Sequence, residues 1–162
     1  MKKTQLNWGF LGAAKIGRSL APAIVASKYA RPYAVASRTR EKAEMYAREN
    51  GFERSFGSYQ ALLKDPNVDV IYNPLPNHLH CEWTIRALEA GKHVLCEKSL
   101  AVTAEECLEL KELAQKRKKF LMVGHVFLFN PGIVQLKKYI QNQDLGKIQY
   151  AHSERTNLGP FR

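Results

Sequence analysis

The sequence has no apolar run that approaches the ~20 residues of a membrane-spanning helix, so we expect no membrane span. The first residues, Met-Lys-Lys-Thr-Gln, are polar and lack the apolar core of a secretory signal peptide. Only three cysteines occur, Cys81, Cys96 and Cys107, and their odd number and wide spacing fit neither a disulfide framework nor a zinc site. We therefore expect a cytoplasmic protein with reduced thiols.

Acidic residues are outnumbered, because 15 Asp and Glu against 25 Lys and Arg give a formal net charge of +10. This balance is compatible with nucleic-acid binding, or with a groove for a multiply phosphorylated cofactor or nucleotide sugar. The densest basic cluster, residues 116–119, stands where a helix should end, and cations are favoured there. We expect a solvated helix end and no nucleic-acid partner, because the chain lacks a recognition motif. No histidines stand with carboxylates at metal-ligand spacing, so no metal is expected.

The start of the chain contains an imperfect dinucleotide-binding motif. The apolar run 6–11 ends in small residues, and Ile16, Leu20 and Ile24 then recur with helical spacing. In the pattern G-x-G-x-x-G the three positions are Gly12, Ala14 and Gly17, so the middle glycine is missing. Small residues there let a pyrophosphate approach backbone N–H groups at the positive end of a helix. The alternative is a tight strand-to-helix turn that needs small residues for packing only.

The second expected strand, residues 32–37, lacks an acidic residue at its tip. NAD-binding units place a carboxylate there to bind the ribose 2′-hydroxyl, whereas this chain has Ser37 and Arg38. A hydroxyl and a guanidinium suit a 2′-phosphate, which indicates NADP in preference to NAD. The alternative is an ordinary exposed arginine at the start of a helix, which Thr39 would cap and which would run to about Asn50.

Strand and helix patterns alternate through six strands, which predicts an α/β fold with a doubly wound, mostly parallel Rossmann sheet. The clearest further strand patterns cover residues 68–72, 92–96 and 120–124. Two prolines follow the strand 68–72 and predict a rigid loop at the sheet edge that faces the ligand crevice.

The end of the chain departs from this rhythm. Residues 1–125 are expected to form the dinucleotide-binding Rossmann domain, and residues 126–162 a connecting helix followed by one strand. Alternation of apolar and polar residues places that strand at 147–154, with Ile148 and Tyr150 on one side. We interpret it as the first strand of a truncated α+β second domain that serves the substrate and oligomerisation.

Three segments together resemble the Gfo/Idh/MocA oxidoreductases, the relatives of glucose–fructose oxidoreductase and inositol dehydrogenase. They are the opening motif, the stretch Pro-Leu-Pro-Asn-His-Leu-His at 74–80 and the stretch Glu-Ala-Gly-Lys-His-Val-Leu-Cys-Glu-Lys-Ser at 89–99. The passage 124–131, Gly-His-Val-Phe-Leu-Phe-Asn-Pro, is similar to members that act on sugars or nucleotide sugars. The resemblance covers essentially the whole chain.

The resemblance implies a set of site residues. The pyrophosphate would lie on Gly12, Ala13, Ala14, Lys15, Ile16 and Gly17, and the adenosine ribose or its phosphate on Ser37 and Arg38. Leu75, Asn77 and His80 would lie along the path to the nicotinamide, with Glu97 and Lys98 beside its ring. Lys98 would be the catalytic residue, because an amine at that place can hand over a proton as hydride arrives at the carbon. Without the resemblance, Lys98 would be taken for a surface lysine.

Two further expectations concern positions where the resemblance is weaker. The family usually has Glu-Lys-Pro, often with a cis bond, whereas this chain has Ser99, and a cis bond before a non-proline residue costs about 2.5–4 kcal/mol. This cost argues for a trans Lys98–Ser99 peptide and the family pattern for a cis one, so the sequence leaves the isomer open. His125, at the end of the strand 120–124, is a candidate substrate contact, and a buried structural histidine is the alternative.

The sequence thus predicts the cofactor-binding part of an NAD(P)-dependent dehydrogenase or reductase, with NADP preferred. The substrate would be a sugar or nucleotide sugar, and the resemblance implies a homo-oligomer for the full-length protein. The alternative is a stand-alone dinucleotide-binding module without turnover. Since the family's second domain completes the site, we expect these 162 residues to fold and to bind the dinucleotide but to turn over poorly.

Overall fold

The computed structural model describes residues 4–154. Contacts within the chain divide it into two compact units, Met1–His125 and Val126–Arg162, and each is described by itself. Among residues 4–154, no helix combines the length and the apolar character that crossing a membrane requires.

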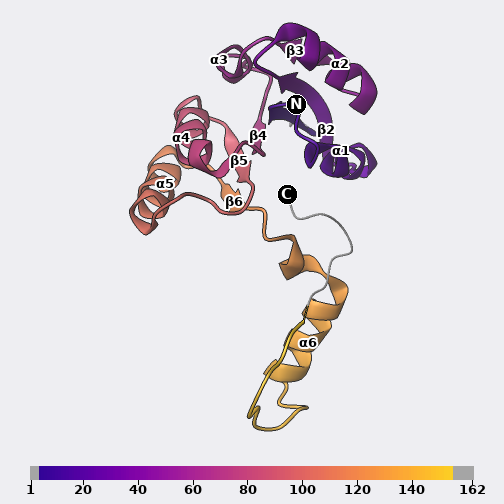
Figure 1. Ribbon diagram of the computed structural model, residues 1–162, viewed down its shortest axis with the longest axis vertical. Helices are drawn as coiled ribbons and strands as arrows, with labels where there is room; N and C mark the ends of the chain where they lie inside the picture. Colours follow the sequence, from indigo (N-terminus) through magenta and orange to yellow (C-terminus); the bar gives the residue numbers. More distant parts are fainter. Residues whose placement is uncertain (1–3, 155–162) are drawn as a thin grey trace. The chain divides into compact units, whose positions relative to one another are not determined.

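The first unit is built on a sheet of six parallel strands in the order β3-β2-β1-β4-β5-β6 (Figure 1). The predicted doubly wound parallel sheet is therefore confirmed. The order reverses between β1 and β4, which pair directly. The strands are β1 (Leu6–Leu11), β2 (Ala30–Ala36), β3 (Arg54–Phe56), β4 (Val70–Asn73), β5 (His93–Cys96) and β6 (Leu121–Val123).

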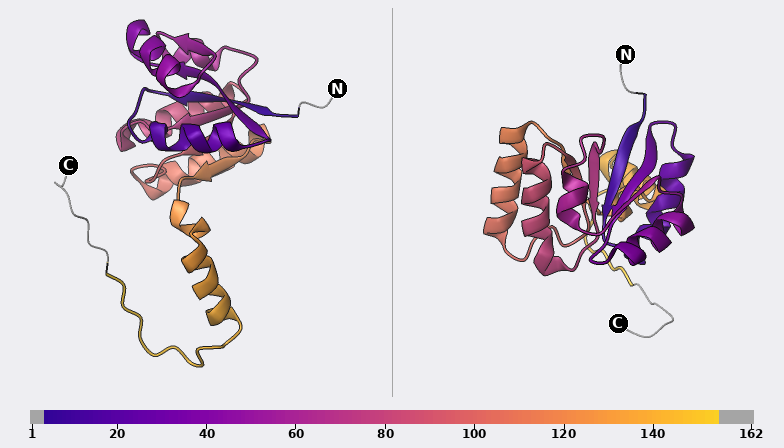
Figure 2. Two further views of the ribbon diagram at one scale, coloured as in Figure 1. Left: turned by 90° about the vertical axis from the view of Figure 1, so that its right-hand side faces the viewer. Right: turned by 90° about the horizontal axis from the view of Figure 1, so that it is seen from above.

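Helices cover both faces of this sheet, as the right-hand view of Figure 2 shows. One core cluster joins the sheet to two helices, and it contains Phe10, Ile24 and Tyr46. The other cluster joins the opposite face to the remaining helices, and it contains Leu62, Trp83 and Ala114. The first two helices are α1 (Gly17–Ala26) and α2 (Arg40–Asn50), and the others are α3 (Tyr59–Leu63), α4 (His80–Glu89) and α5 (Ala104–Arg117).

Local signals in the sequence account for several helix ends. The Ser58 side chain accepts a hydrogen bond from the Ala61 N–H at the start of α3. Thr103 and Glu106 form a reciprocal capping box at the start of α5. Thr39 precedes α2 as predicted, but its side chain makes no capping hydrogen bond. Gly51 ends α2 with a left-handed φ of 72°, a conformation that glycine adopts without steric cost.

Two details of the first unit differ from the sequence pattern. Ile16 was expected on the buried face of the first helix, but it precedes α1 and is half exposed. The buried face of α1 consists instead of Gly17, Ala21 and Ile24, because small residues let the helix approach the sheet closely. Strand β3 is only three residues long, so it carries too little alternation to be located from its sequence.

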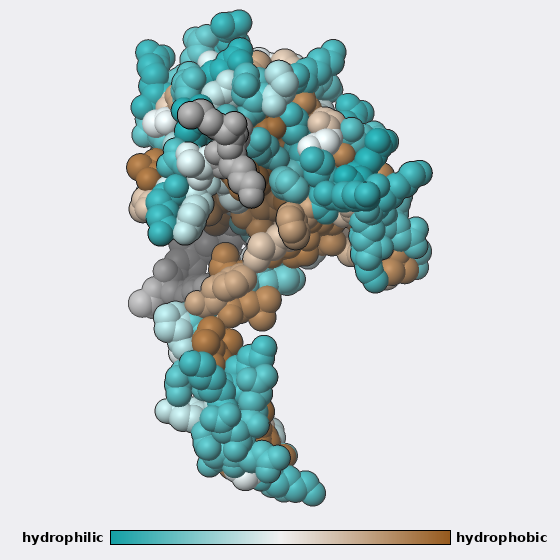
Figure 3. Space-filling view, turned by 180° about the vertical axis from the view of Figure 1, so that it is seen from behind, coloured by the Kyte–Doolittle hydropathy of each residue, from teal (hydrophilic) through white to brown (hydrophobic). Residues whose placement is uncertain are grey.

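The basic cluster 116–119 lies at the end of α5, as predicted. The helix ends at Arg117, and Lys118 follows in a left-handed conformation with φ 53°. The side chains of Lys116, Arg117 and Lys118 are exposed. Much of the visible surface of the first unit is likewise hydrophilic (Figure 3).

The second unit contains a short 3₁₀ helix η2 (Val126–Phe129) and the helix α6 (Pro131–Gln141). The Asn130 side chain caps α6 by accepting hydrogen bonds from the N–H groups of Gly132 and Ile133. The prediction of a strand at 147–154 is wrong. These residues form neither strand nor helix, and no strand within residues 4–154 pairs with them. Period-two alternation alone does not make a strand, since its backbone groups need a neighbouring strand to bond to.

Candidate functional site

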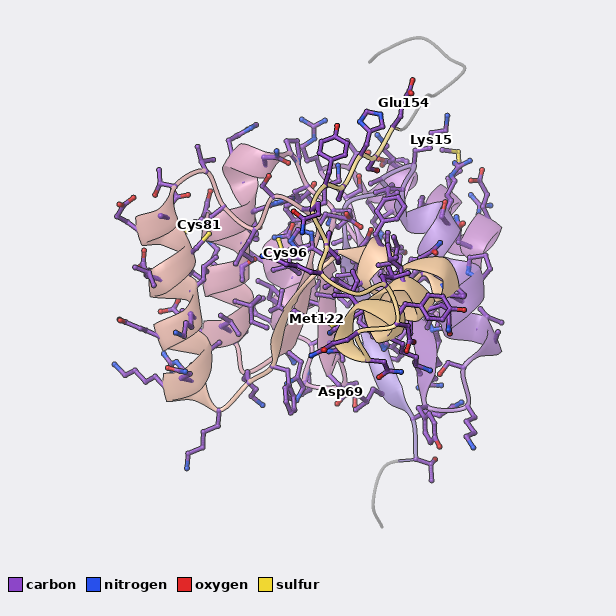
Figure 4. The ribbon with its side chains drawn as sticks, turned by 90° about the horizontal axis from the view of Figure 1, so that it is seen from below. Lys15, Asp69, Cys81, Cys96, Met122 and Glu154 are labelled. Carbon is purple, nitrogen blue, oxygen red and sulfur yellow. The ribbon has the colours of Figure 1, made fainter. Side chains whose placement is uncertain are left out.

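The carboxyl ends of the parallel strands form the edge at which ligands bind in open α/β sheets, and the binding point is where the strand order reverses. In this chain the reversal lies between β1 and β4. The turn after β1, the loop after β4 and the residues after β5 all leave the sheet at this edge. Figure 4 shows the polarity of the sheet, because Lys15, beyond the end of β1, and Asp69, before β4, lie at opposite ends of the strands.

Gly12 is required by the geometry of the turn after β1. Its φ of 90° is a conformation that L-residues with a side chain rarely adopt, and a Cβ there would lie 3.2 Å from Leu75 Cδ2. Its N–H donates to the Ala36 carbonyl at 2.8 Å, which joins the turn to the end of β2. The first turn of the motif is thus in contact with both neighbouring strand ends.

Gly17 serves a different purpose, namely close packing of α1. A Cβ on Gly17 would lie 2.6 Å from the Tyr46 hydroxyl and 3.2 Å from the Phe10 ring. The Tyr46 hydroxyl donates to the Ala14 carbonyl at 3.2 Å, so a side chain of α2 is hydrogen-bonded to the turn. Burial raises the pKa of Tyr46, which keeps the hydroxyl protonated and able to donate.

The middle of the turn offers unused backbone donors. Within the described part of the chain, no protein acceptor takes a hydrogen bond from the backbone N–H groups of Ala13, Ala14, Lys15 or Ile16. A shallow pocket beside them is lined by Ala13, Lys15, Arg18 and Ser19. Backbone N–H groups at the start of a helix, with the cationic side chain of Lys15 beside them, suit an anion, whereas Arg18 already pairs with Glu49 at 2.9 Å. The turn could therefore hold the pyrophosphate of a dinucleotide.

The end of β2 places Ser37 and Arg38 at the same edge. Ser37 is buried and donates its backbone N–H to the Phe56 carbonyl at 3.0 Å, whereas Arg38 is exposed. Burial raises the pKa of Tyr59, and the charge of Arg38 opposes that rise. The Tyr59 hydroxyl also lies 3.6 Å from where a Cβ on Gly12 would stand.

Tyr59, the first residue of α3, is a candidate site residue that the sequence analysis did not name. Its ring packs edge-on against Trp83 with 4.9 Å between ring centroids, which anchors the apolar part of the side chain.

The loop after β4 places its three predicted residues in different environments. Leu75 is buried and in contact with Gly12, while Asn77 is exposed in the short 3₁₀ helix η1 (Asn77–Leu79). His80 is fully buried, with Nδ1 2.6 Å from the Ser99 carbonyl and Nε2 2.6 Å from the Leu75 carbonyl. The imidazole therefore lies beneath the loops and connects the one after β4 to the one after β5.

Glu97 and Lys98 follow β5. The Glu97 N–H donates to the Asn73 carbonyl at 3.0 Å, and its carboxylate accepts from the Tyr72 hydroxyl at 2.7 Å. Lys98 is exposed and forms no ion pair with any residue from 4 to 154. The Lys98–Ser99 peptide, whose isomer the sequence leaves open, is cis. The Ser99 carbonyl at this bend is the group that His80 contacts.

The remaining candidate, His125, is exposed at the end of the first unit, so the alternative of a buried structural histidine is wrong. Residues 4–154 contain no group of three or more His, Cys, Asp and Glu placed to hold a metal ion. The expectation that the protein uses no metal stays a prediction.

The chain is similar to known oxidoreductases over most of its length. A dTDP-3,4-didehydro-2,6-dideoxy-α-D-glucose 3-reductase of Streptomyces violaceoruber is 39% identical over 145 residues, 89% of this chain and 42% of that enzyme. A D-xylose 1-dehydrogenase (NADP(+)) of Haloferax volcanii is 40% identical over 127 residues, 78% of this chain and 39% of that enzyme. The chain thus spans about two fifths of the length of these relatives.

A solved structure gives the same result. The 3-ketoreductase of Actinomadura kijaniata in complex with NADP superposes with a TM-score of 0.83 at 35% identity, covering 90% of this chain and 46% of that one. Residues 6–125 match the family described as an oxidoreductase family with an NAD-binding Rossmann fold. Since this match covers most of the 162 residues, the resemblance drawn from the sequence is confirmed, and the protein belongs to the Gfo/Idh/MocA oxidoreductase family.

Proposed function

We propose that this chain binds NADP(H) in preference to NAD(H) and takes part in hydride transfer to or from a sugar or nucleotide sugar. The observation that carries the proposal is the convergence of three features at one sheet edge. They are the anion-binding turn at 12–17, a free guanidinium at the end of β2, and the pair Glu97–Lys98 at the end of β5. A dinucleotide spans such an edge with one nucleotide on each half of the sheet.

The preference for NADP rests on Arg38. This guanidinium forms no ion pair with a residue in the range 4–154, so it is available to an anion. The buried Ser37 hydroxyl beside it adds a neutral hydrogen-bonding group. A 2′-phosphate gains charge-assisted hydrogen bonds from an arginine, whereas the ribose hydroxyl of NAD lacks the carboxylate that it usually finds.

The chemistry that we assign to the second half of the site is proton transfer. A bound nicotinamide supplies or accepts the hydride. Lys98, which is exposed at this edge, would exchange a proton with the oxygen of the reacting carbon. Glu97, which Tyr72 and the backbone of β4 hold in place, would lie on the same side. Asn77 and His125 are exposed and would face the cofactor path and the substrate, respectively.

The substrate class is proposed from the relatives. One acts, by its name, as a dTDP-sugar 3-reductase, and one as a D-xylose dehydrogenase. The 3-ketoreductase has also been solved with NADP and TDP-benzene together. A carbonyl or hydroxyl carbon of a sugar, free or linked to a nucleotide, is therefore the proposed reaction centre. The segment 126–162 is proposed to begin the part that serves the substrate and a homo-oligomer.

The experiment is calorimetric titration of the chain with NADP⁺ and with NAD⁺, followed by Arg38→Asp. We expect NADP⁺ to bind more tightly and the variant to reverse the order. A tenfold preference for NAD⁺, about 1.4 kcal/mol, would contradict the proposal. Arg40→Asp is the matched control, because Arg40 is two residues away but already pairs with Glu44 at 2.9 Å.

An assay with sugars and nucleotide sugars then tests the proposed catalysis. Turnover that is lost in Lys98→Ala, with cofactor affinity retained, would support the role of Lys98. Turnover that survives this substitution would contradict it. Tight cofactor binding with no turnover on any substrate would favour the alternative, a dinucleotide-binding module without catalysis.

A further inference from the structure

Tyr72 is a buried tyrosine whose hydroxyl reaches the ligand-binding edge of the sheet. The side chain is 1% exposed, and its ring packs against Phe10 with 4.8 Å between ring centroids. The hydroxyl donates to Glu97 Oε1 at 2.7 Å across two neighbouring parallel strands. Burial raises the pKa of Tyr72, and the hydrogen bond to Glu97 raises it further, so the hydroxyl remains a donor throughout the physiological range.

Gly124 limits the same carboxylate from the other side. A Cβ on Gly124 would lie 3.2 Å from Glu97 Oε2 and 3.3 Å from Oε1. The backbone of Gly124 is not left-handed, so its conformation does not require glycine. The absence of a side chain at Gly124 instead leaves space for the Glu97 carboxylate. Its N–H donates to the Cys96 carbonyl at 2.7 Å, which fixes this backbone against β5. The carboxylate thus fills a place shaped by three successive strand ends.

The charge of Glu97 is not neutralised by the protein around it. No ion pair among residues 4–154 includes Glu97, and the neighbouring Lys98 is exposed. The thiol of the preceding residue, Cys96, is uncharged at neutral pH because burial raises its pKa to about 12. A half-buried anion without a protein counter-charge interacts strongly with any cation that a ligand brings.

The half of the sheet formed by β4, β5 and β6 takes the second nucleotide of a dinucleotide, because the first strand-to-helix turn takes the pyrophosphate and β2 the adenosine ribose. In NADP(H) this second nucleotide is the nicotinamide one. Its ring carries a positive charge in the oxidised form and none in the reduced form. A fixed carboxylate at this end therefore distinguishes the two forms by charge alone.

We propose that Glu97, held in place by the Tyr72 hydroxyl and the space above Gly124, makes the site favour the oxidised cofactor. Tyr72 is then a positioning residue, which acts on the cofactor only through Glu97. This inference rests on the proposed function, since it assumes a nicotinamide dinucleotide. The inference goes beyond the proposed function in one respect: the site would bind the positively charged, oxidised ring more tightly than the neutral, reduced ring.

The test is the ratio of two dissociation constants, that for NADP⁺ divided by that for NADPH, measured by calorimetry on the 162-residue chain. We expect Glu97→Gln to raise this ratio about tenfold, because the amide keeps the shape and removes the charge. Tyr72→Phe and Gly124→Ala should raise it several-fold, since each displaces the carboxylate without removing it. A purely structural role would weaken both forms equally and leave the ratio unchanged.

Two controls separate this effect from general loss of structure. Tyr33→Phe removes the hydroxyl of another buried tyrosine in the same sheet, one that contacts Arg54 at 3.4 Å, and should not change the ratio. In the Glu97→Gln background, adding Tyr72→Phe should have no further effect on the ratio. Thermal unfolding of each variant shows whether it is folded, and Glu97→Gln keeps the test decisive if Tyr72→Phe is not.

An unchanged ratio in Glu97→Gln would overturn the inference while leaving the proposed function intact. A change caused by Tyr72→Phe in the Glu97→Gln background would overturn the positioning role of Tyr72. Failure of the unmodified chain to bind either form would overturn the proposed function itself, together with this inference.

Discussion

The two halves of the sheet build their parts of the site in different ways. On the side of β1, β2 and β3 the site is mostly backbone, in which Gly12 turns with a positive φ and Gly17 brings α1 against Tyr46. On the side of β4, β5 and β6 the site is held by side chains. His80 connects two loop carbonyls there, and Tyr72 holds the Glu97 carboxylate.

This difference has a chemical reason. A pyrophosphate is recognised by backbone N–H groups, which any sequence supplies once small residues allow the approach. Proton and hydride transfer instead require particular side chains at particular positions, and these need a supporting layer of hydrogen bonds. We therefore expect substitutions in the first half to destabilise the protein by steric crowding. Substitutions in the second half should destabilise it by removing hydrogen bonds.

The largest effect is expected in the second half, from His80→Leu. The substitution removes the fully buried imidazole that lies 2.6 Å from both loop carbonyls, and loss of its N–H leaves one of them without a donor, at a cost of about 1–3 kcal/mol. The apolar side chain also cannot connect the two loops. Chemical denaturation should show this loss of stability. His78→Leu is the matched control, since His78 is exposed two residues earlier, and it should change stability little. Equal effects of the two substitutions would contradict the account.

A somewhat smaller effect is expected in the first half, from Gly17→Ala. The new Cβ would lie 2.6 Å from the Tyr46 hydroxyl, and crowding of this kind costs about 1–3 kcal/mol. Adding Tyr46→Phe should recover part of the loss, because it removes the crowded oxygen. Gly57→Ala is the control, since its Cβ would meet Arg40 Cβ at an ordinary 3.4 Å. No recovery in the double variant would show that the hydroxyl is not the cause.

The smallest effect concerns the pH dependence of stability in the second half, away from the site. The Phe120 N–H donates to His93 Nδ1 at 2.9 Å. Burial and, secondarily, Lys119 lower the pKa of His93 below its ordinary value of 6.5, so the folded state prefers the neutral ring. The unfolded chain takes up the proton first, and stability should fall as the pH drops below about 6.5.

His93→Asn sharpens this prediction, because the amide oxygen can accept the same hydrogen bond and does not titrate. Denaturation at pH 7.5 and pH 5.0 should show a smaller loss of stability in this variant than in the unmodified chain. The same loss in both would exclude His93 as the cause.

The sequence was informative where function depends on backbone and small residues. Gly12, Gly17 and the parallel character of the sheet follow from local patterns, whereas the order of its strands does not. The contacts of Tyr72 and His80 could not be foreseen, because each joins segments that only the folded sheet brings together. Tyr72 alternates within a strand like any core residue, and nothing local marks its hydroxyl as a partner of Glu97.

At 147–154 the sequence pattern instead predicted a strand that the structure does not contain. The alternation around Ile148 and Tyr150 is real, but both residues are exposed and no strand in the described part of the chain lies beside them. A sequence pattern states a preference for burial on one face, and only a pairing partner turns it into a strand.

Adenosine 2′,5′-bisphosphate tests the division of the site most directly, because it carries the adenosine half of NADP with its 2′-phosphate and no nicotinamide. Calorimetric titration should show equal affinity for the unmodified chain and for Glu97→Gln, and at least tenfold weaker binding to Arg38→Asp, about 1.4 kcal/mol. Loss of binding in Glu97→Gln, or full binding in Arg38→Asp, would contradict the assignment of the two nucleotides to the two halves of the sheet.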